Sequence, residues 1–130
     1  MSAARRWFEE IEIGEESVSP GRTVTESDIV LFAGLSGDYN ILHTDAEFMK
    51  ASIFGERIAH GLLGLAIQAG LFSRAGIPYA TLGFGTLRWK FKGPIKIGVP
   101  QNCSYVSRQG EFAQIMASAA ARSRRTPLAA

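Results

Sequence analysis

The sequence is poor in residues that build covalent or metal-held scaffolds. Its 130 residues include one cysteine, Cys103, and two histidines, His43 and His60. A single cysteine cannot form a disulfide within the chain, which suits a reducing compartment. So few nitrogen and sulfur ligands argue against a zinc site with three or four of them. We therefore expect no metal and no cofactor, and we interpret Cys103 as an inert, half-buried residue.

Long apolar runs and a strong charge bias are also missing. No stretch approaches the roughly 18 consecutive apolar residues that suggest a membrane-spanning helix, and residues 1–8 contain two arginines with no apolar run behind them. The net charge is only +2, and much of the basic character lies in a tail with Arg122, Arg124 and Arg125. We therefore expect neither membrane insertion nor nucleic-acid binding, and a cytoplasmic protein is the default expectation.

What is present is the composition of a globular domain. Hydrophobic residues make up 46% of the chain and charged residues 20%, which is typical of folded soluble domains. Neither an internal repeat nor a separate linker is visible. The length suits one domain over residues 1–130.

The first half of the chain combines a strand signal with helix-start signals. Residues 17–24 resemble a half-buried strand in which Pro20 indicates an edge or a bulge. The Thr25-Glu-Ser-Asp28 sequence resembles a capping box and predicts a helix over 26–34. A similar signal at 44–47 predicts a short helix over 45–51.

The second half combines one very apolar helix with strand-like segments. Residues 61–72 are apolar on nearly every side, so we expect a helix that is buried all round. Residues 86–92 alternate between apolar and polar side chains and predict a strand, and a further strand is expected near 102–106. The order of elements predicts an α+β domain with one curled antiparallel sheet around the helix.

The C-terminal region fits this pattern less well. Residues 112–121 are rich in alanine and are ambiguous between strand and helix, although the alanine content favours a helix. Residues 122–130 have no apolar periodicity. We therefore expect the C-terminal strands of the sheet to be atypical or incomplete.

The residues with catalytic potential gather in a polar segment, residues 34–45. In one continuous helix Asp38 and His43 would lie about 140° apart around the axis, too far to cooperate. They can meet only if the chain turns between them. Gly34 and Gly37 can end a helix, and Asn40 tolerates a left-handed backbone. The segment therefore predicts a helix, a polar turn and a short second helix.

Two segments of the sequence resemble motifs of a known family. They are Ser36-Gly-Asp-Tyr-Asn-Ile-Leu-His-Thr-Asp45 and Phe54-Gly-Glu-Arg-Ile-Ala-His-Gly-Leu-Leu63. They are similar to the hydratase-2 motif and the start of the central helix in MaoC-like (R)-specific enoyl-CoA hydratases. The resemblance covers residues 18–99. Ile41 stands where the family usually has proline, and the C-terminal region departs from the family's two long strands.

The resemblance implies a hot-dog fold, in which a curled sheet wraps the long helix and two protomers form a homodimer. It also implies that Asp38 and His43 form a catalytic dyad with Asn40 in support. Adding water to a 2-enoyl thioester needs a base, a proton for C2 and stabilisation of the thioester oxygen. The backbone N–H of Gly61, at the start of the buried helix, is a candidate for the last task.

Simpler interpretations stand beside these. A Gly-Asp-x-Asn sequence is often an ordinary turn. We interpret His60 as holding the loop before the helix rather than as a third catalytic group, although it is also a candidate substrate contact. Lys90 and Lys92 are either a solvated strand face or a contact for coenzyme phosphates.

The leading hypothesis is a hydro-lyase that acts on a trans-2-enoyl thioester of coenzyme A or acyl carrier protein. A hot-dog thioesterase is a second enzyme hypothesis. A non-catalytic acyl-thioester-binding subunit of a heterodimeric dehydratase is a third, which the atypical tail favours and the presence of both dyad residues opposes. The sequence does not indicate the acyl chain length or the carrier.

Overall fold

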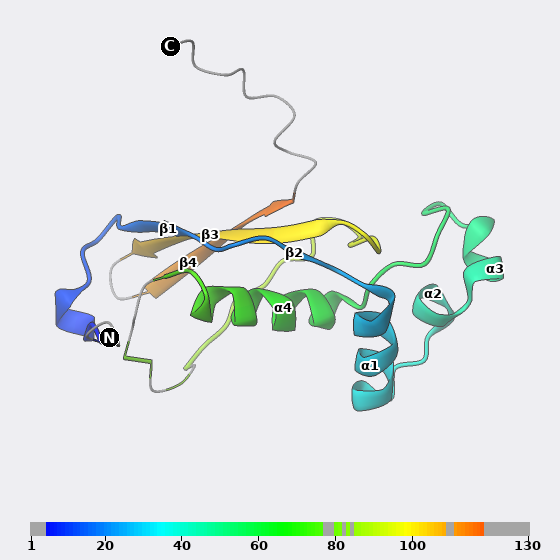
Figure 1. Cartoon of the computed structure of the whole chain (residues 1–130), viewed down its shortest axis with the longest axis horizontal. Coiled ribbons are helices and arrows are strands. Elements are labelled where there is room, and N and C mark those ends of the chain that lie inside the picture. The colour runs from blue at the N-terminus through cyan, green and yellow to red at the C-terminus, as the bar shows by residue number, and fades with distance from the viewer. Residues whose placement is uncertain (1–4, 77–79, 82, 84, 109–110, 119–130) are drawn as a thin grey trace, which may run out of the picture.

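The structure is a computed structural model that describes residues 5–76, 80–81, 83, 85–108 and 111–118, the last eight through their backbone. Its elements begin with a short 3₁₀ helix, followed by two short strands, four helices and two longer strands (Figure 1). In chain order they are η1 (Phe8–Glu10), β1 (Glu16–Val18), β2 (Arg22–Thr23), α1 (Glu26–Ser36), α2 (Ile41–Thr44), α3 (Ala46–Lys50), α4 (Gly61–Ser73), β3 (Pro100–Arg108) and β4 (Glu111–Ser118).

The sheet is antiparallel and has β3 at its centre. β1 and β2 pair with successive parts of β3, through Ser17↔Tyr105 and Arg22↔Gln101, whereas β4 pairs with β3 through eight residues. Pro20 lies between β1 and β2, where a residue without an N–H cannot donate to the ladder. The strand predicted over 17–24 is therefore confirmed as two short strands around this break.

The core lies where α4 packs against the sheet and α1 (Figure 1). On the sheet side, the Tyr105 hydroxyl donates to the Gln68 backbone oxygen over 3.1 Å, and the Tyr105 and Phe72 rings are 4.8 Å apart. Apolar side chains from α1, α4 and the flanking segments complete the cluster; its buried members are Val24, Ile29, Ala59, Leu63, Ile67 and Leu71.

The α4 helix is buried on one side only, which corrects the prediction of a helix buried all round. Leu63, Ile67 and Leu71 are buried, whereas Leu62 is 60% exposed and Ala66 is also exposed. The reason is that the sheet remains open and covers one face of the helix. Part of the apolar face of α4 is thus left facing outwards.

The strand predicted over 86–92 is wrong for this chain, because residues 86–95 have no strand assignment. The side chains of Leu87 and Phe91 are 56% and 65% exposed. This segment runs against α4 instead: the Ala59 N–H donates to the Ile95 carbonyl oxygen over 2.7 Å, and Ile95 packs against the backbone of Gly64. Alternation predicts a strand only where a partner strand is available to pair with it.

The helix favoured for residues 112–121 is also wrong over residues 112–118, the part that the structure describes. Residues 111–118 form β4, which pairs with β3 along its length. Pairing with a neighbouring strand has overridden the helix propensity of alanine. Residues 119–130, and with them the predicted features of the tail, lie outside the described residues.

The helix predictions in the first half are confirmed by α1 and α3. At the start of α1, the Asp28 N–H donates to Thr25 Oγ1 and the Thr25 N–H donates to Asp28 Oδ2, so the capping box is complete. Burial raises the pKa of the Asp28 carboxyl, but hydrogen bonds from Thr25 and Arg22 outweigh this effect and leave the pKa lowered.

Within the described ranges, no helix is long and apolar enough to cross a membrane.

Candidate active site

The polar segment folds as a helix, a turn and a short helix, as predicted. Gly37 ends α1 in a left-handed conformation with φ 74°, and its N–H donates to the Ala33 carbonyl oxygen over 2.8 Å. Glycine adopts this conformation without the steric cost that a Cβ would add. Gly34 lies inside α1, and Asn40 has φ −54°, so Gly37 alone supplies the left-handed residue in this turn.

Asn40 connects the two halves of the candidate dyad. Its backbone N–H donates to Asp38 Oδ1 over 3.2 Å, which helps to orient the carboxylate. Its side-chain Oδ1 accepts from the Leu42 N–H over 3.0 Å and so caps the start of α2, the helix that contains His43. A capping side chain satisfies a backbone donor that the first turn of a helix leaves unpaired.

His43 is held in one orientation by the loop before α4. Its Nδ1 lies 2.7 Å from the backbone oxygen of Ile58, and the Ile58 N–H donates to the Leu42 oxygen over 3.1 Å. A carbonyl oxygen only accepts, so Nδ1 must be the protonated nitrogen. In the neutral ring Nε2 is then a bare acceptor that can take a proton.

His60 lies directly behind the dyad and is only 2% exposed. Its Nε2 lies 2.9 Å from the Asp38 backbone oxygen, and its ring stacks on the His43 ring with 3.8 Å between centroids and a tilt of 32°. The Phe32 ring is 5.0 Å from it. The sequence interpretation placed His60 in the loop but missed these contacts; the His-Gly pair marked the residue, and nothing in the pattern indicated Phe32.

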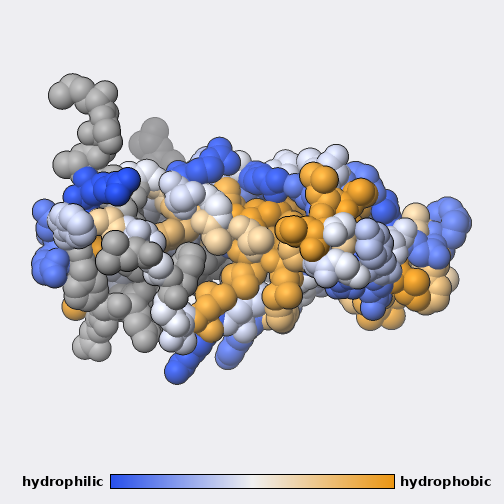
Figure 2. All heavy atoms as spheres, turned by 90° about the horizontal axis from the view of Figure 1, so that it is seen from below, coloured by the Kyte–Doolittle hydropathy of each residue, from blue (hydrophilic) through white to orange (hydrophobic). Residues whose placement is uncertain are grey.

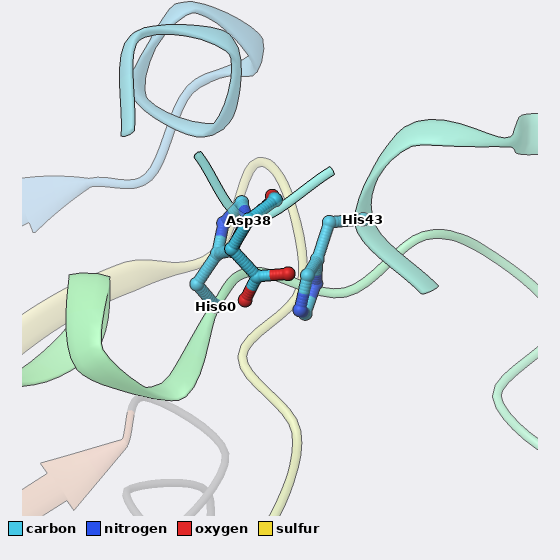
Figure 3. Close-up of side chains that lie close together, drawn as sticks. All are labelled: Asp38, His43 and His60. Carbon is cyan, nitrogen blue, oxygen red and sulfur yellow. The ribbon is translucent and has the colours of Figure 1, made fainter. Parts of the chain in front are cut away.

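Together, Asp38, His43 and His60 offer one nitrogen or oxygen atom each within 4.8 Å of one another (Figure 3). Among the described residues, no hydrogen bond joins the Asp38 carboxylate directly to either ring. Two acceptors at such a separation can share one water, since each O–H···O or O–H···N contact spans about 2.8 Å. The arrangement therefore suits proton transfer through a bound water.

The same residue types also bind divalent metals, so the fit to a metal needs a geometric test. A ring nitrogen binds a metal along a lone pair in the plane of its ring. Stacked rings direct these lone pairs side by side rather than towards one point, and the His43 and His60 rings are stacked with 3.8 Å between centroids and a tilt of 32° between their planes. The geometry thus favours acid–base chemistry over metal binding.

The start of α4 is closely approached by another part of the chain. A Cβ on Gly61 would lie 2.6 Å from Cε1 of Phe91, so this position requires glycine unless the Phe91 ring moves. Lys90 and Lys92, on either side of Phe91 in sequence, are exposed. The hydrogen bonds and ring contacts of Asp38, His43 and His60 involve neither lysine.

A hollow of about 350 Å³ lies farther along α4 and does not include the dyad. Its wall combines apolar side chains of α4 with the ion pair between Arg22 and Asp28, whose nitrogen and oxygen are 2.5 Å apart. The lining residues are Arg22, Asp28, Leu63, Ala66, Ile67, Gly70, Leu71 and Arg74.

Comparison with protein families matches residues 9–106 to the MaoC like domain. The chain belongs to the MaoC-like family. The match begins before the first strand and ends inside β3, so it includes the whole of the candidate site.

Curated relatives support this assignment over the same part of the chain. "Protein MaoC" of Klebsiella aerogenes is 44% identical over 94 residues, which are 72% of this chain and 28% of that protein. "(R)-specific enoyl-CoA hydratase" of Rhodospirillum rubrum is 43% identical over 93 residues, 71% of this chain and 62% of that protein. The chain therefore spans less than two thirds of the length of either relative.

Solved structures support the fold. The "Monoamine oxidase regulatory protein from Archaeoglobus fulgius" has a TM-score of 0.72 and 38% identity over 82% of this chain and 72% of that one. "R-Hydratase PhaJ1 from Pseudomonas aeruginosa in the unliganded form" has a TM-score of 0.71 and 29% identity, covering 87% of this chain and 76% of that one. The MaoC-like chain thus has the hot-dog fold that its sequence predicts, with a sheet that stays open.

Proposed function

We propose that this MaoC-like chain is a hydro-lyase that adds water to a trans-2-enoyl thioester and gives an (R)-3-hydroxyacyl thioester. The observation that supports it best is the placement of the His43 ring, with one nitrogen within 4.8 Å of an Asp38 carboxylate oxygen and with Nδ1 held by the Ile58 backbone oxygen so that Nε2 is bare. The names of two relatives, "(R)-specific enoyl-CoA hydratase" and "3-hydroxybutyryl-CoA dehydratase", agree with this reaction.

In the proposed reaction, Asp38 and His43 share one water molecule. As the water oxygen bonds to C3, one of its protons passes to the dyad, and the electron pair of the C2–C3 bond moves towards the thioester carbonyl. A proton from the dyad then bonds to C2. The sum is one water added across the double bond, and the dyad returns to its starting protonation state. The two groups act as a coupled pair rather than as separately ranked acid and base.

The developing charge on the thioester oxygen needs donors near the dyad. The first turn of an α-helix has backbone N–H groups with no partner inside the helix, and its dipole favours negative charge. α4 begins at Gly61, directly after His60, so its first N–H groups lie beside the cluster. We propose the Gly61 N–H as the donor, with the Phe91 ring shifting when the thioester binds.

The substrate carrier is coenzyme A or acyl carrier protein, both of which present the acyl group on a phosphate-containing arm. Lys90 and Lys92 are exposed on the segment that passes the start of α4. They stay candidates for binding these phosphates. If they have that role, replacing both by alanine raises KM and leaves kcat nearly unchanged, because a phosphate contact is made equally in the ground state and the transition state.

We further propose that the active unit is a homodimer. Helices α1 and α4 leave large apolar side chains uncovered, including Leu31 and Leu35 of α1 and Leu62 of α4. Figure 2 shows hydrophobic side chains gathered in the middle and to the right of the face seen from below. Contiguous exposed apolar surface commonly marks an interface. A second copy of the chain is the occupant that we propose for this surface.

Adding crotonyl-CoA to the purified chain tests the proposal. Hydration removes the conjugated double bond, so the absorbance of the enoyl thioester should fall while no free thiol is released. A thioesterase would release free thiol instead. Binding of crotonyl-CoA without either change would indicate the non-catalytic subunit and contradict the proposal.

A further inference from the structure

His60 is an unusual residue to find in its position. It is 2% exposed and precedes α4 as its N-cap residue, yet its side chain makes no capping hydrogen bond to that helix. Among the described residues, its Nδ1 is buried without a hydrogen-bond partner. Burying an unsatisfied polar atom destabilises a fold, and an apolar ring of similar size would avoid that cost. The stability of the core alone therefore does not explain a histidine here.

His60 contacts both members of the dyad, Asp38 and His43. Its Nε2–H donates to the backbone oxygen of Asp38 over 2.9 Å, and this hydrogen bond holds the backbone of Asp38 in place. Its ring face packs on the His43 ring at 3.8 Å between centroids. Phe32 contacts the ring at 5.0 Å and so helps to hold it in place.

The dyad needs such a connection because its two members lie on separate elements. Asp38 is in the turn after α1 and His43 is in α2, and no hydrogen bond between their side chains is present in the described part of the chain. The turn and α2 are joined by the Asn40 contacts and by the Thr44 hydroxyl, which donates to the backbone oxygens of Tyr39 and Asn40 over 3.2 and 3.1 Å. None of these contacts reaches the ring of His43. The chemistry requires the two groups to hold one water at the correct distance from C3, and misplacement of a catalytic group by about 1 Å can cost about a hundredfold in rate.

We propose that His60 is a positioning residue that sets the distance and orientation between Asp38 and His43. This inference rests on the proposed function of the dyad. Histidine suits the task because one ring combines an N–H donor with a flat face. Phenylalanine could stack on His43 but could not donate to Asp38, and glutamine could donate but could not stack.

Three variants separate these two contacts: His60→Phe keeps the ring, His60→Gln keeps a donor, and His60→Ala keeps neither. With crotonyl-CoA, His60→Ala should lower kcat about 10- to 100-fold while KM changes less than about threefold, because the effect is on geometry in the transition state. The Phe and Gln variants should each recover part of that loss. Ile67→Val, a core change on α4 away from the dyad, controls for general loosening and should keep kcat near the parent value.

A double-variant comparison distinguishes positioning from general structural support. If His60 acts only through the dyad, His60→Phe should have almost no further effect on kcat in an Asp38→Asn background. A purely structural role would give the same fractional loss in both backgrounds. Thermal unfolding of each variant identifies those that are folded at the assay temperature, and the Gln variant decides the question if the Phe variant does not fold.

The outcomes for the two proposals are separate. Full activity of Asp38→Asn and His43→Ala would overturn the proposed function itself. Loss of activity in those two variants together with near-parent kcat in folded His60 variants would overturn the positioning role alone. Equal fractional losses in the two backgrounds would also overturn it.

Discussion

Ile41 shows how a single residue can depart from the family pattern without disturbing the turn. It is the first residue of α2, the position in a helix where proline is favoured. Asn40, the residue before it, has φ −54° and ψ 139°, which is compatible with a following proline. Within the described ranges, the Ile41 N–H donates no backbone hydrogen bond that a proline would remove. Isoleucine is thus tolerated here, although it leaves the unfolded chain more freedom.

The prediction at this position is that Ile41→Pro stabilises the protein. We expect the free energy of unfolding to rise by about 0.4–1 kcal/mol, because proline restricts the unfolded chain and fits the folded one. Chemical denaturation measures the change, and crotonyl-CoA turnover should stay near the parent rate. Ile53→Pro is a useful comparison, since residue 53 is exposed and lies in a turn outside the first position of a helix. A destabilised Ile41→Pro variant would show that the turn geometry is not as described.

Residue types in the polar segment were enough to predict the turn and to nominate Asp38 and His43. Gly37 ends α1 as predicted. The residues alone also suit an ordinary turn, and it was the family resemblance that implied the dyad of Asp38 and His43. The stacking of His60 on His43 could not be predicted in this way. It depends on how α4 meets α2 across residues that are far apart in sequence, and a one-dimensional pattern does not contain that information.

At the scale of elements, the contact between α4 and the segment before β3 is very close. A Cβ on Gly64 would lie 2.4 Å from Cδ1 of Ile95, whereas a Cβ on Gly70 of the same helix would meet nothing within 4 Å. Both glycines lie in α4, but only Gly70 has free space for an added methyl group. They form a matched pair for testing this packing.

We predict opposite effects for alanine at the two positions. Gly64→Ala should destabilise the protein by about 1–3 kcal/mol, because the added methyl group overpacks the core against Ile95. Gly70→Ala should stabilise it by about 0.5–1 kcal/mol, because alanine favours the helix and has free space. Urea denaturation of both variants measures this difference. Equal effects at the two sites would contradict the packing of Ile95 against α4.

The elements that sequence patterns predicted well are those with local signals. The capping box fixed the start of α1, and continuous apolar character located α4. The patterns failed at residues 86–92 and 111–118, where the outcome depends on whether another strand is adjacent. Residues 86–92 alternate but have no partner strand in the described part of the chain, and Phe91 lies against the start of α4. Residues 111–118 pair with β3 despite their alanine content.

At the scale of the whole molecule, the open sheet and the exposed face of α4 predict association. Light scattering at micromolar concentration should give about twice the 14.1 kDa mass of the chain. Dilution below the dissociation constant should lower the specific activity, because a separated protomer would expose its apolar face to water. A monomer that keeps full specific activity on dilution would rule out the homodimer as the active unit.

The central claim is that Asp38 and His43 together activate water, and replacing each of them tests it most directly. Asp38→Asn and His43→Ala should each lower kcat/KM for crotonyl-CoA by at least about a hundredfold, as expected when a general acid–base group is lost. Asp38 lies in the polar turn and His43 in the short helix α2, and neither belongs to the apolar core, so the thermal unfolding midpoint should stay near that of the parent. Glu47→Gln, an exposed change on α3, is the control and should keep the parent rate. Near-parent kcat/KM in either dyad variant would contradict the account.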